Sequence, residues 1–242
     1  MLASTRKRLG TGTRLAHHDG KSFSAFHVLP GENFPEAQLG DLCSAEDGGL
    51  WIAHGTKGVT LLKDGHLTEF GSEQGYLGAG GNFISNSKGH VWSYTTDALM
   101  RFDKGSWHVV YRSSPGHDII SHANFDSDGN LWAIIGSNLF VLPENGAHFV
   151  KAPNGPDGAM HVFPGGTGHL YVVAKRTKLH IYRRSGLSLT EEAKPVLAPI
   201  YTVLESRSGA VWMGSTLQGL YYISSDELAA AESEHRSPAF NT

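Results

Sequence analysis

Hydrophobic and polar positions follow a pattern along this chain that recurs about every 40 residues. In each copy, a polar turn with a glycine precedes one aliphatic residue and then a large aromatic residue. The five glycines are Gly48, Gly89, Gly129, Gly168 and Gly209, and the aromatic residues three positions later are Trp51, Trp92, Trp132, Tyr171 and Trp212. Successive aromatic residues are 41, 40, 39 and 41 positions apart, so the chain contains an internal repeat.

Each repeat predicts four β-strands. The glycine allows the positive φ of a tight hairpin turn, and the aliphatic and aromatic residues after it begin a strand. Because neighbours in a strand point to opposite faces, this strand is apolar on both faces and must be covered on both sides. Other apolar segments precede and follow it, as at residues 201–205, 99–102 and 106–111. Four strands in one such period are typical of a β-propeller blade, so we predict an all-β propeller of four-stranded blades.

The repeat also sets the expected domain organisation. Residues 1–8 are an N-terminal remnant, and residues 9–223 hold about six repeats: a partial blade at 9–38, blades at about 39–79, 80–119, 120–158 and 159–199, and a partial blade at 200–223. The strands of the two partial blades overlap rather than complement each other. We therefore expect a partial propeller or a fragment of a larger one, with an exposed blade edge. For residues 224–242, the capping-box spacing of Ser224 and Glu227 predicts a short helix at 228–234, followed by a loose tail.

Composition narrows the possible partners. The formal net charge is −3 and no basic stripe is present, so we do not expect a nucleic-acid partner. The single cysteine, Cys43, excludes an intrachain disulfide. No run of 18 apolar residues occurs, and residues 1–20 lack the apolar stretch of a signal peptide. We expect no membrane contact through this segment.

Polar residues recur at one position in the predicted first strands. Seven positions before the aligned glycines, the sequence has Asp41, Asn82, His122, His161 and Thr202, each followed by an apolar residue. First strands of propeller blades line the central channel, and ligands bind around it. These five residues are therefore our candidate ligand-binding set at the channel mouth, suited to a small polar molecule, a glycan or a cation. The alternative is that strand starts are polar because the channel holds water.

Catalytic and metal-binding patterns are not evident. The sequence has 14 histidines, but none forms a short motif with zinc-like spacing, and His66, His90, His108 and His169 fall at expected surface positions. No nucleophile elbow, phosphate-binding loop or dinucleotide fingerprint occurs. We therefore predict no cofactor, no metal and no catalytic residue.

The repeat motif resembles that of a known family. Residues 46–52, 126–132 and 208–215 are similar to the two-component regulator propeller repeat, and residues 15–23 are similar to its Gly-Leu-x-x-Phe-Asp-Gly segment. The resemblance implies an extracytoplasmic or periplasmic sensor propeller of a bacterial histidine kinase or a related signalling protein. It also implies that kinase activity lies in downstream signalling domains. Those domains, or further propeller blades, are the partners that we expect in an intact protein. Tyr171, in place of tryptophan, departs from the pattern.

These observations favour a non-catalytic, ligand-sensing propeller that is part of a two-component signal transduction protein. A protein–protein interaction scaffold is one alternative, and a propeller lyase or hydrolase is another. A large exposed apolar face would favour the scaffold. A convergent acid–base pair at the channel mouth would favour the enzyme.

Overall fold

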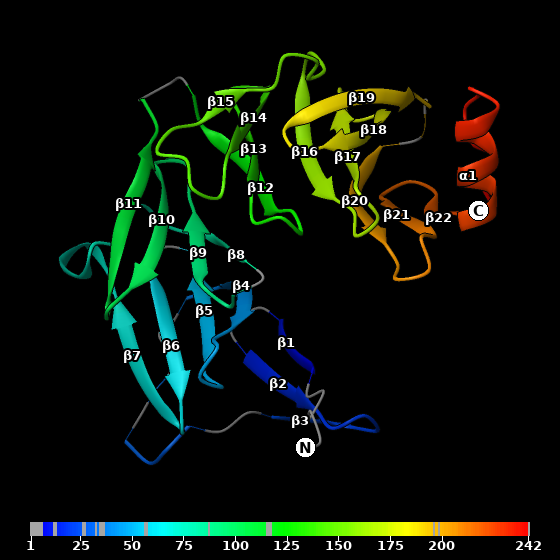
Figure 1. Cartoon of the computed structure of the whole chain (residues 1–242). Helices are drawn as coiled ribbons and strands as arrows, with labels where there is room; N and C mark the ends of the chain where they lie inside the picture. The colour runs from blue at the N-terminus through cyan, green and yellow to red at the C-terminus, as the bar shows by residue number, and fades with distance from the viewer. Residues whose placement is uncertain are drawn as a thin grey trace. The chain divides into compact units, whose positions relative to one another are not determined.

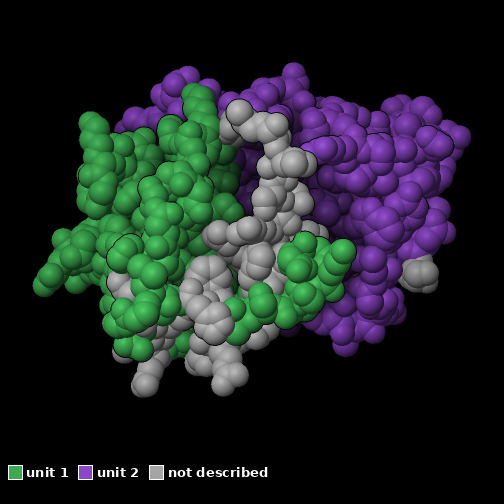
Figure 2. All heavy atoms as spheres, turned by 90° about the horizontal axis from the view of Figure 1, so that it is seen from below, with its two compact units in different colours: residues 1–119 green, residues 120–242 purple. Residues whose placement is uncertain are grey.

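The computed structural model describes residues 7–11, 14–25, 28–31, 33, 37–55, 58–86, 88–114, 118–195, 197 and 199–241. These residues form antiparallel sheets and one α-helix, so the predicted all-β class is confirmed (Figure 1). The chain divides into two compact units, residues 1–119 and 120–242 (Figure 2). Each unit is described by itself.

The first unit contains one three-stranded sheet and two four-stranded sheets. In every sheet the strands are hydrogen-bonded in sequence order, as in propeller blades. The bounds are β1 (Lys7–Thr11), β2 (Arg14–His18) and β3 (Phe23–Ala25) in the first sheet; β4 (Leu39–Ser44), β5 (Leu50–His54), β6 (Val59–Lys63) and β7 (His66–Phe70) in the second; and β8 (Asn82–Ser85), β9 (Val91–Tyr94), β10 (Ala98–Asp103) and β11 (Ser106–Arg112) in the third, which the 3-10 turn η1 (Ser72–Gln74) precedes.

The second unit contains two four-stranded sheets and one three-stranded sheet, again with strands in sequence order. The bounds are β12 (Ile120–Phe125), β13 (Leu131–Ile135), β14 (Asn138–Leu142) and β15 (Val150–Lys151); β16 (Ala159–Pro164), β17 (His169–Ala174), β18 (Lys178–Ser185) and β19 (Ser188–Ala193); and β20 (Ile200–Glu205), β21 (Val211–Ser215) and β22 (Gly219–Ile223), followed by the helix α1 (Ser225–Ser233).

The glycine of the repeat builds the same turn in every copy. All five motif glycines have φ between 78° and 89°, a conformation that residues with a Cβ rarely adopt. In the third copy, Asp126 Oδ1 accepts hydrogen bonds from the amides of Asp128 and Asn130, both at 2.9 Å. Its other oxygen, Oδ2, accepts from Trp132 Nε1 at 2.8 Å. The aspartate of the motif therefore links the turn to the aromatic residue of the strand that follows.

Three of the motif aromatics, Trp51, Trp132 and Tyr171, are each covered by the sheet that comes next in the chain. Trp51 of β5 meets Phe102 and Trp107 of the following sheet, with ring centroids 4.6 Å and 5.2 Å away. In the same way, Trp132 is buried in one cluster with residues of β16–β19, and Tyr171 in another with residues of β20–β22. Face-to-face packing of neighbouring sheets within each unit therefore explains why an apolar pair opens the second strand of a blade.

Trp212 departs from this rule. Its side chain is 39 % exposed, and it shares an open face of the β20–β22 sheet with Leu204 and Leu220, which are exposed as well. Trp212 packs instead against Tyr222 of its own sheet, with ring centroids 4.4 Å apart. The prediction that the strand is covered on both sides therefore fails for this copy within the described residues of the second unit, because no other sheet of that unit packs on this face.

The C-terminal tail is not loose. The helix begins at Ser225, and Ser224 Oγ accepts a hydrogen bond from the amide of Glu227 at 3.2 Å as its N-cap. After the helix, Asn241 exchanges two backbone hydrogen bonds of 2.9 Å with Tyr222, and Phe240 packs against the neighbouring core. The tail thus pairs with part of the edge of β22. Within the described residues, no helix is both long enough and apolar enough to cross a membrane.

Candidate functional site

Three first strands of the second unit bring aromatic and polar side chains together. Strand β12 packs beside β16, and β16 beside β20. His122 on β12 and His161 on β16 meet edge to face, with ring centroids 5.1 Å apart at 88°. The exposed Tyr201 of β20 lies 6.1 Å from the His161 ring, and Phe163 lies 4.8 Å from that of His122. Thr202, the next residue of β20, is exposed.

A β-bulge accompanies each of these positions. The pairing register shifts between Ile120 and His122, between Ala159 and His161, and between Ile200 and Thr202. The extra residue in each strand is therefore Ser121, Met160 or Tyr201. Bulges bend a strand and redirect side chains, and they are over-represented next to functional sites. The repeated bulge explains why Tyr201, which sequence analysis did not select, joins the histidines.

The two histidines are neutral at physiological pH. Val162 N donates to Nδ1 of His122 at 3.3 Å, which assigns the proton of this imidazole to Nε2. Burial, together with the adjacent His161, lowers the pKa of His122 to about 4, and burial also lowers the pKa of His161. Nδ1 of His161 is buried and forms no hydrogen bond with any described residue. Such an unsatisfied buried nitrogen is rare in folded proteins, and a bound molecule or water would satisfy it.

In the first unit, Asp41 has the same structural role as His122. Asp41 Oδ2 accepts a hydrogen bond from Phe83 N of β8 at 2.8 Å, and Oδ1 accepts from Leu42 N at 2.8 Å. Phe83 directly follows Asn82, just as Val162 directly follows His161. Both Asp41 and His122 therefore tie their first strand to that of the next sheet. Asn82 itself is exposed at the start of β8.

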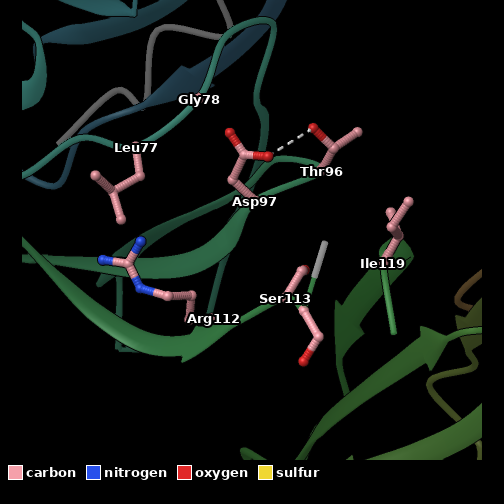
Figure 3. A pocket seen from close by; sticks show the side chains of 8 residues that line it. Leu77, Gly78, Thr96, Asp97, Arg112, Ser113 and Ile119 are labelled. Atoms are coloured by element: carbon pink, nitrogen blue, oxygen red, sulfur yellow. Dashed lines mark hydrogen bonds between the residues drawn. The ribbon is translucent and has the colours of Figure 1, made fainter. Parts of the chain in front are cut away.

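A pocket of about 480 Å³ also lies in the first unit (Figure 3). Leu77 and Gly78 line it before β8, Thr96 and Asp97 line it between β9 and β10, and residues 112–114 and 119 complete it. Because Asn82 pairs with Tyr94, just before this turn, the pocket lies at the end of the sheet where the first strand begins. The Arg112 guanidinium and the Asp97 carboxylate give it polar, charged groups. This pocket cannot be recognised in the sequence, because loops from three separate segments form it.

Asp41 and Asn82 thus lie on neighbouring first strands of the first unit, and His122, His161 and Thr202 lie on neighbouring first strands of the second. The continuous polar ring remains a prediction. Of the histidines expected at the surface, His66, His90 and His108 are exposed, whereas the expectation for His169 is wrong, because this side chain is buried among carboxylates.

Sheets with this strand order, glycine turn and covered aromatic define a β-propeller protein. No family model matches the sequence, and no curated protein matches it in sequence. Solved structures share the fold at low identity. The extracellular domain of a hybrid two-component system from B. thetaiotaomicron is 15 % identical with a TM-score of 0.69, over 92 % of this chain and 31 % of that chain. Virginiamycin B lyase from Staphylococcus aureus is 14 % identical with a TM-score of 0.65, over 86 % and 72 %.

A third structure, YCF48 bound to D1 peptide, is 12 % identical with a TM-score of 0.68, over 90 % of this chain and 74 % of that chain. Identities this low establish a common fold and nothing more specific. The chain spans about a third of the length of the two-component sensor domains that it matches.

Proposed function

We propose that this chain is a ligand-sensing propeller segment without catalytic activity, part of an extracytoplasmic sensor in a bacterial two-component signalling protein. In this proposal it contributes six blade repeats, two of them three-stranded. One observation carries the ligand-binding part: the bulged first strands of the second unit present His122, His161 and Tyr201 side by side. The similarity in fold to extracellular domains of two-component systems supports the signalling part.

The chemistry of the site suits a small polar ligand with a ring. Tyr201 and Phe163 offer aromatic faces for stacking, and neutral imidazoles can donate or accept a hydrogen bond without carrying a charge. Nδ1 of His161, which lacks a partner among the described residues, is the acceptor that a ligand hydroxyl would satisfy once the imidazole turns. Sugars and glycan fragments combine apolar ring faces with hydroxyl donors, so they are the ligand class that we propose.

A thermal-shift screen against mono- and oligosaccharides tests this proposal. We expect at least one compound to raise the melting temperature of the wild type, and the shift to be lost in His161→Gln and Tyr201→Ala. Within the described part of the chain, neither side chain forms a hydrogen bond that ties strands together, so both variants should fold. His66→Gln, at an exposed histidine of the first unit, is the matched control and should keep the shift. Shifts that persist unchanged in His161→Gln and Tyr201→Ala would remove the proposed site.

The enzyme alternative has one specific observation in its favour. A neutral histidine can act as a general base, and His122 and His161 are both held neutral. Virginiamycin B lyase shares the fold, and one of its structures contains quinupristin. Incubating this chain with quinupristin and following the compound by mass spectrometry separates the two readings. We expect no conversion, and turnover that depends on His161 would replace the sensor proposal with a lyase.

The scaffold alternative rests on the open face of the β20–β22 sheet, with Leu204, Trp212 and Leu220 exposed. In the β12–β15 and β16–β19 sheets, the aromatic at this position is covered by the next sheet of the repeat. The face is therefore better suited to a further sheet of the same kind than to an unrelated protein.

A further inference from the structure

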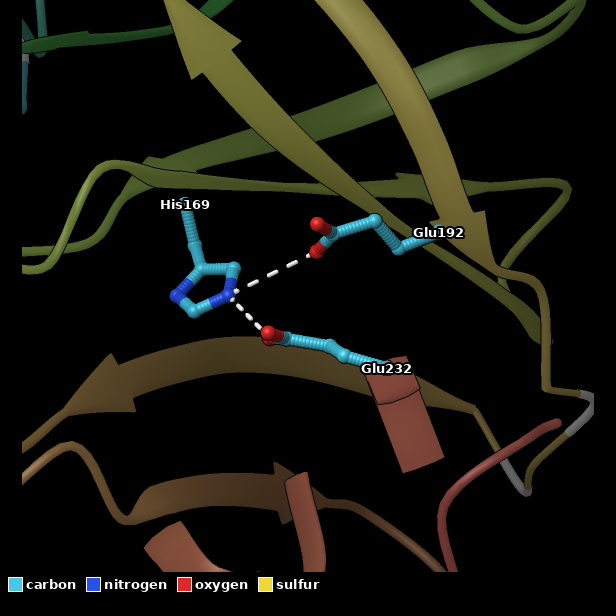
Figure 4. A group of neighbouring side chains, drawn as sticks. All are labelled: His169, Glu192 and Glu232. Atoms are coloured by element: carbon cyan, nitrogen blue, oxygen red, sulfur yellow. Dashed lines mark hydrogen bonds and ion pairs between the residues drawn. The ribbon is translucent and has the colours of Figure 1, made fainter. Parts of the chain in front are cut away.

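A partly buried polar cluster in the second unit lies apart from the proposed ligand site. His169 of β17, Glu192 of β19 and Glu232 of α1 point toward one another (Figure 4). His169 Nε2 lies 2.6 Å from Glu232 Oε1 and 3.6 Å from Glu192 Oε2. The His169 side chain is only 5 % exposed. The group is not recognisable in the sequence, because its members are 23 and 40 positions apart and belong to three elements.

The cluster exists because the fourth turn motif lacks an acidic residue. Gly165 stands where the third copy has Asp126, and the carboxylate of Glu205 enters from the next sheet instead. A Cβ on residue 165 would lie 2.2 Å from Glu205 Oε2, so a side chain there would exclude this carboxylate. Glu205 takes over the bonds of the missing aspartate. It accepts from Thr167 N at 2.9 Å and from the Tyr171 hydroxyl at 2.6 Å.

Glu205 also fixes the orientation of His169. Its Oε2 lies 3.1 Å from His169 Nδ1, which places a proton on Nδ1 and directs Nε2 at the other two carboxylates. A histidine that binds a metal almost always donates its second ring N–H to a carboxylate or carbonyl in this manner.

We propose that His169, Glu192 and Glu232 form a binding site for a divalent transition-metal ion of the zinc class. Nitrogen and carboxylate oxygen are ligands that Zn²⁺ accepts. Donor atoms in a tetrahedral zinc site with bonds of about 2.0–2.1 Å lie about 3.3 Å apart. The two separations from His169 Nε2, 2.6 Å and 3.6 Å, lie on either side of that value. A displacement of the Glu232 carboxylate by under about 1 Å would open the required space.

An unsatisfied hydrogen-bond acceptor and an excess of negative charge in the cluster both favour a bound cation. Glu192 Oε2 is buried and has no hydrogen-bond partner among the described residues, although buried carboxylate oxygens are normally satisfied. Arg183 occupies the remaining oxygens, with Nε 3.1 Å from Glu192 Oε1 and Nη2 2.6 Å from Glu232 Oε2. Three carboxylates, counting Glu205, face one guanidinium. A divalent ion in place of the Nε2 proton brings the total charge to zero.

The proposed ligands connect the helix α1 to the β16–β19 sheet. Glu232 is the one ligand on α1, whereas His169 and Glu192 belong to the β16–β19 sheet. A bound ion would therefore hold the helix against this sheet, in addition to the contacts of Leu228 with the core. We expect metal binding to stabilise the docked helix, since a ligand that binds the native state raises its stability.

The experiment uses the full chain after treatment with a chelator and dialysis. We expect titration with Co²⁺ to produce the visible absorption bands of a low-symmetry site, and Zn²⁺ to displace the Co²⁺ and raise the melting temperature. Glu192→Gln and Glu232→Gln should each weaken Zn²⁺ binding at least tenfold, measured by competition with a chelator of known affinity. Glutamine keeps the size and polarity of glutamate, so both variants should fold, which far-UV circular dichroism verifies.

Glu191→Gln is the matched control, because Glu191 bonds His180 in the same sheet but lies outside the proposed ligand set. Zn²⁺ affinity should be unchanged in this variant. The proposal is overturned if the wild type does not bind Zn²⁺ or Co²⁺, if Glu192→Gln and Glu232→Gln bind like the wild type, or if Glu191→Gln loses affinity equally. None of these outcomes depends on the sugar screen, so the metal site and the ligand site are tested separately.

Discussion

The next sheet covers Trp132 but no described sheet of the second unit covers Trp212, so alanine substitutions at these two positions should have different costs. Trp132 is fully buried and its Nε1 donates to Asp126 Oδ2 at 2.8 Å, whereas Trp212 is 39 % exposed. Truncating a buried tryptophan costs about 3–5 kcal/mol, and loss of a donor to a buried carboxylate adds to the cavity term. We therefore expect Trp132→Ala to fall in the upper part of that range. Trp212→Ala should cost roughly 1–2 kcal/mol, because truncation at an open face leaves no closed cavity.

Thermal unfolding followed by far-UV circular dichroism measures the difference without using tryptophan fluorescence, which both substitutions alter. One kcal/mol shifts the melting temperature of a chain of this size by about 2–4 °C. The decrease for Trp132→Ala should therefore be at least twice that for Trp212→Ala, under identical buffer and heating rate. Equal decreases, or a larger one for Trp212→Ala, would refute the idea that coverage by the next sheet sets the contribution of each aromatic residue.

Three further predictions concern single groups. The folded pKa of His122, about 4, lies below its ordinary value of 6.5. The stability that the neutral imidazole contributes is therefore complete above pH 6.5, and up to about 3 kcal/mol is lost as the pH falls from 6.5 towards 4. Urea unfolding across this range should depend less on pH in His122→Asn, and an identical pH profile would contradict the assignment. Gly165→Ala should destabilise the protein by about 1–3 kcal/mol because its Cβ meets Glu205, whereas Gly166→Ala, with open space at that position, should be near neutral in the same denaturant titration. Phe240→Ala should lower the melting temperature by a few degrees, because Phe240 packs against the core beside β22. It should also increase hydrogen exchange at the amide of Tyr222, which pairs with the tail, and unchanged exchange there would argue against that pairing.

The repeat could be predicted from the sequence because it depends on local chemistry. A glycine with positive φ before an apolar pair shows directly in the residue types, and all five glycines have that conformation. The polar position seven residues before each glycine was equally visible. The structural role of this position was not visible in the sequence. Only the packing of the next first strand reveals that Asp41 and His122 accept backbone hydrogen bonds from it.

The remaining features depend on contacts between distant segments. Trp212 carries the same motif as Trp132, and only the surroundings of its sheet make it exposed. The glycine at position 165 gives no hint that Glu205, 40 positions later, fills its space and turns His169 inward. The position of the tail likewise depends on a distant contact, because Asn241 pairs with Tyr222 on the outer edge of β22. Polar patterns in one sequence show which residues face a surface, but not which distant partner meets them.

Histidine-selective NMR of the wild type with the best compound from the sugar screen tests the central functional claim most directly. We expect the imidazole signals of His122 and His161 to report neutral rings at pH 7 and to move with increasing ligand, while those of the exposed His66 and His108 stay in place. Movement confined to His66 and His108, or His122 and His161 signals that a saturating ligand leaves unchanged, would contradict it.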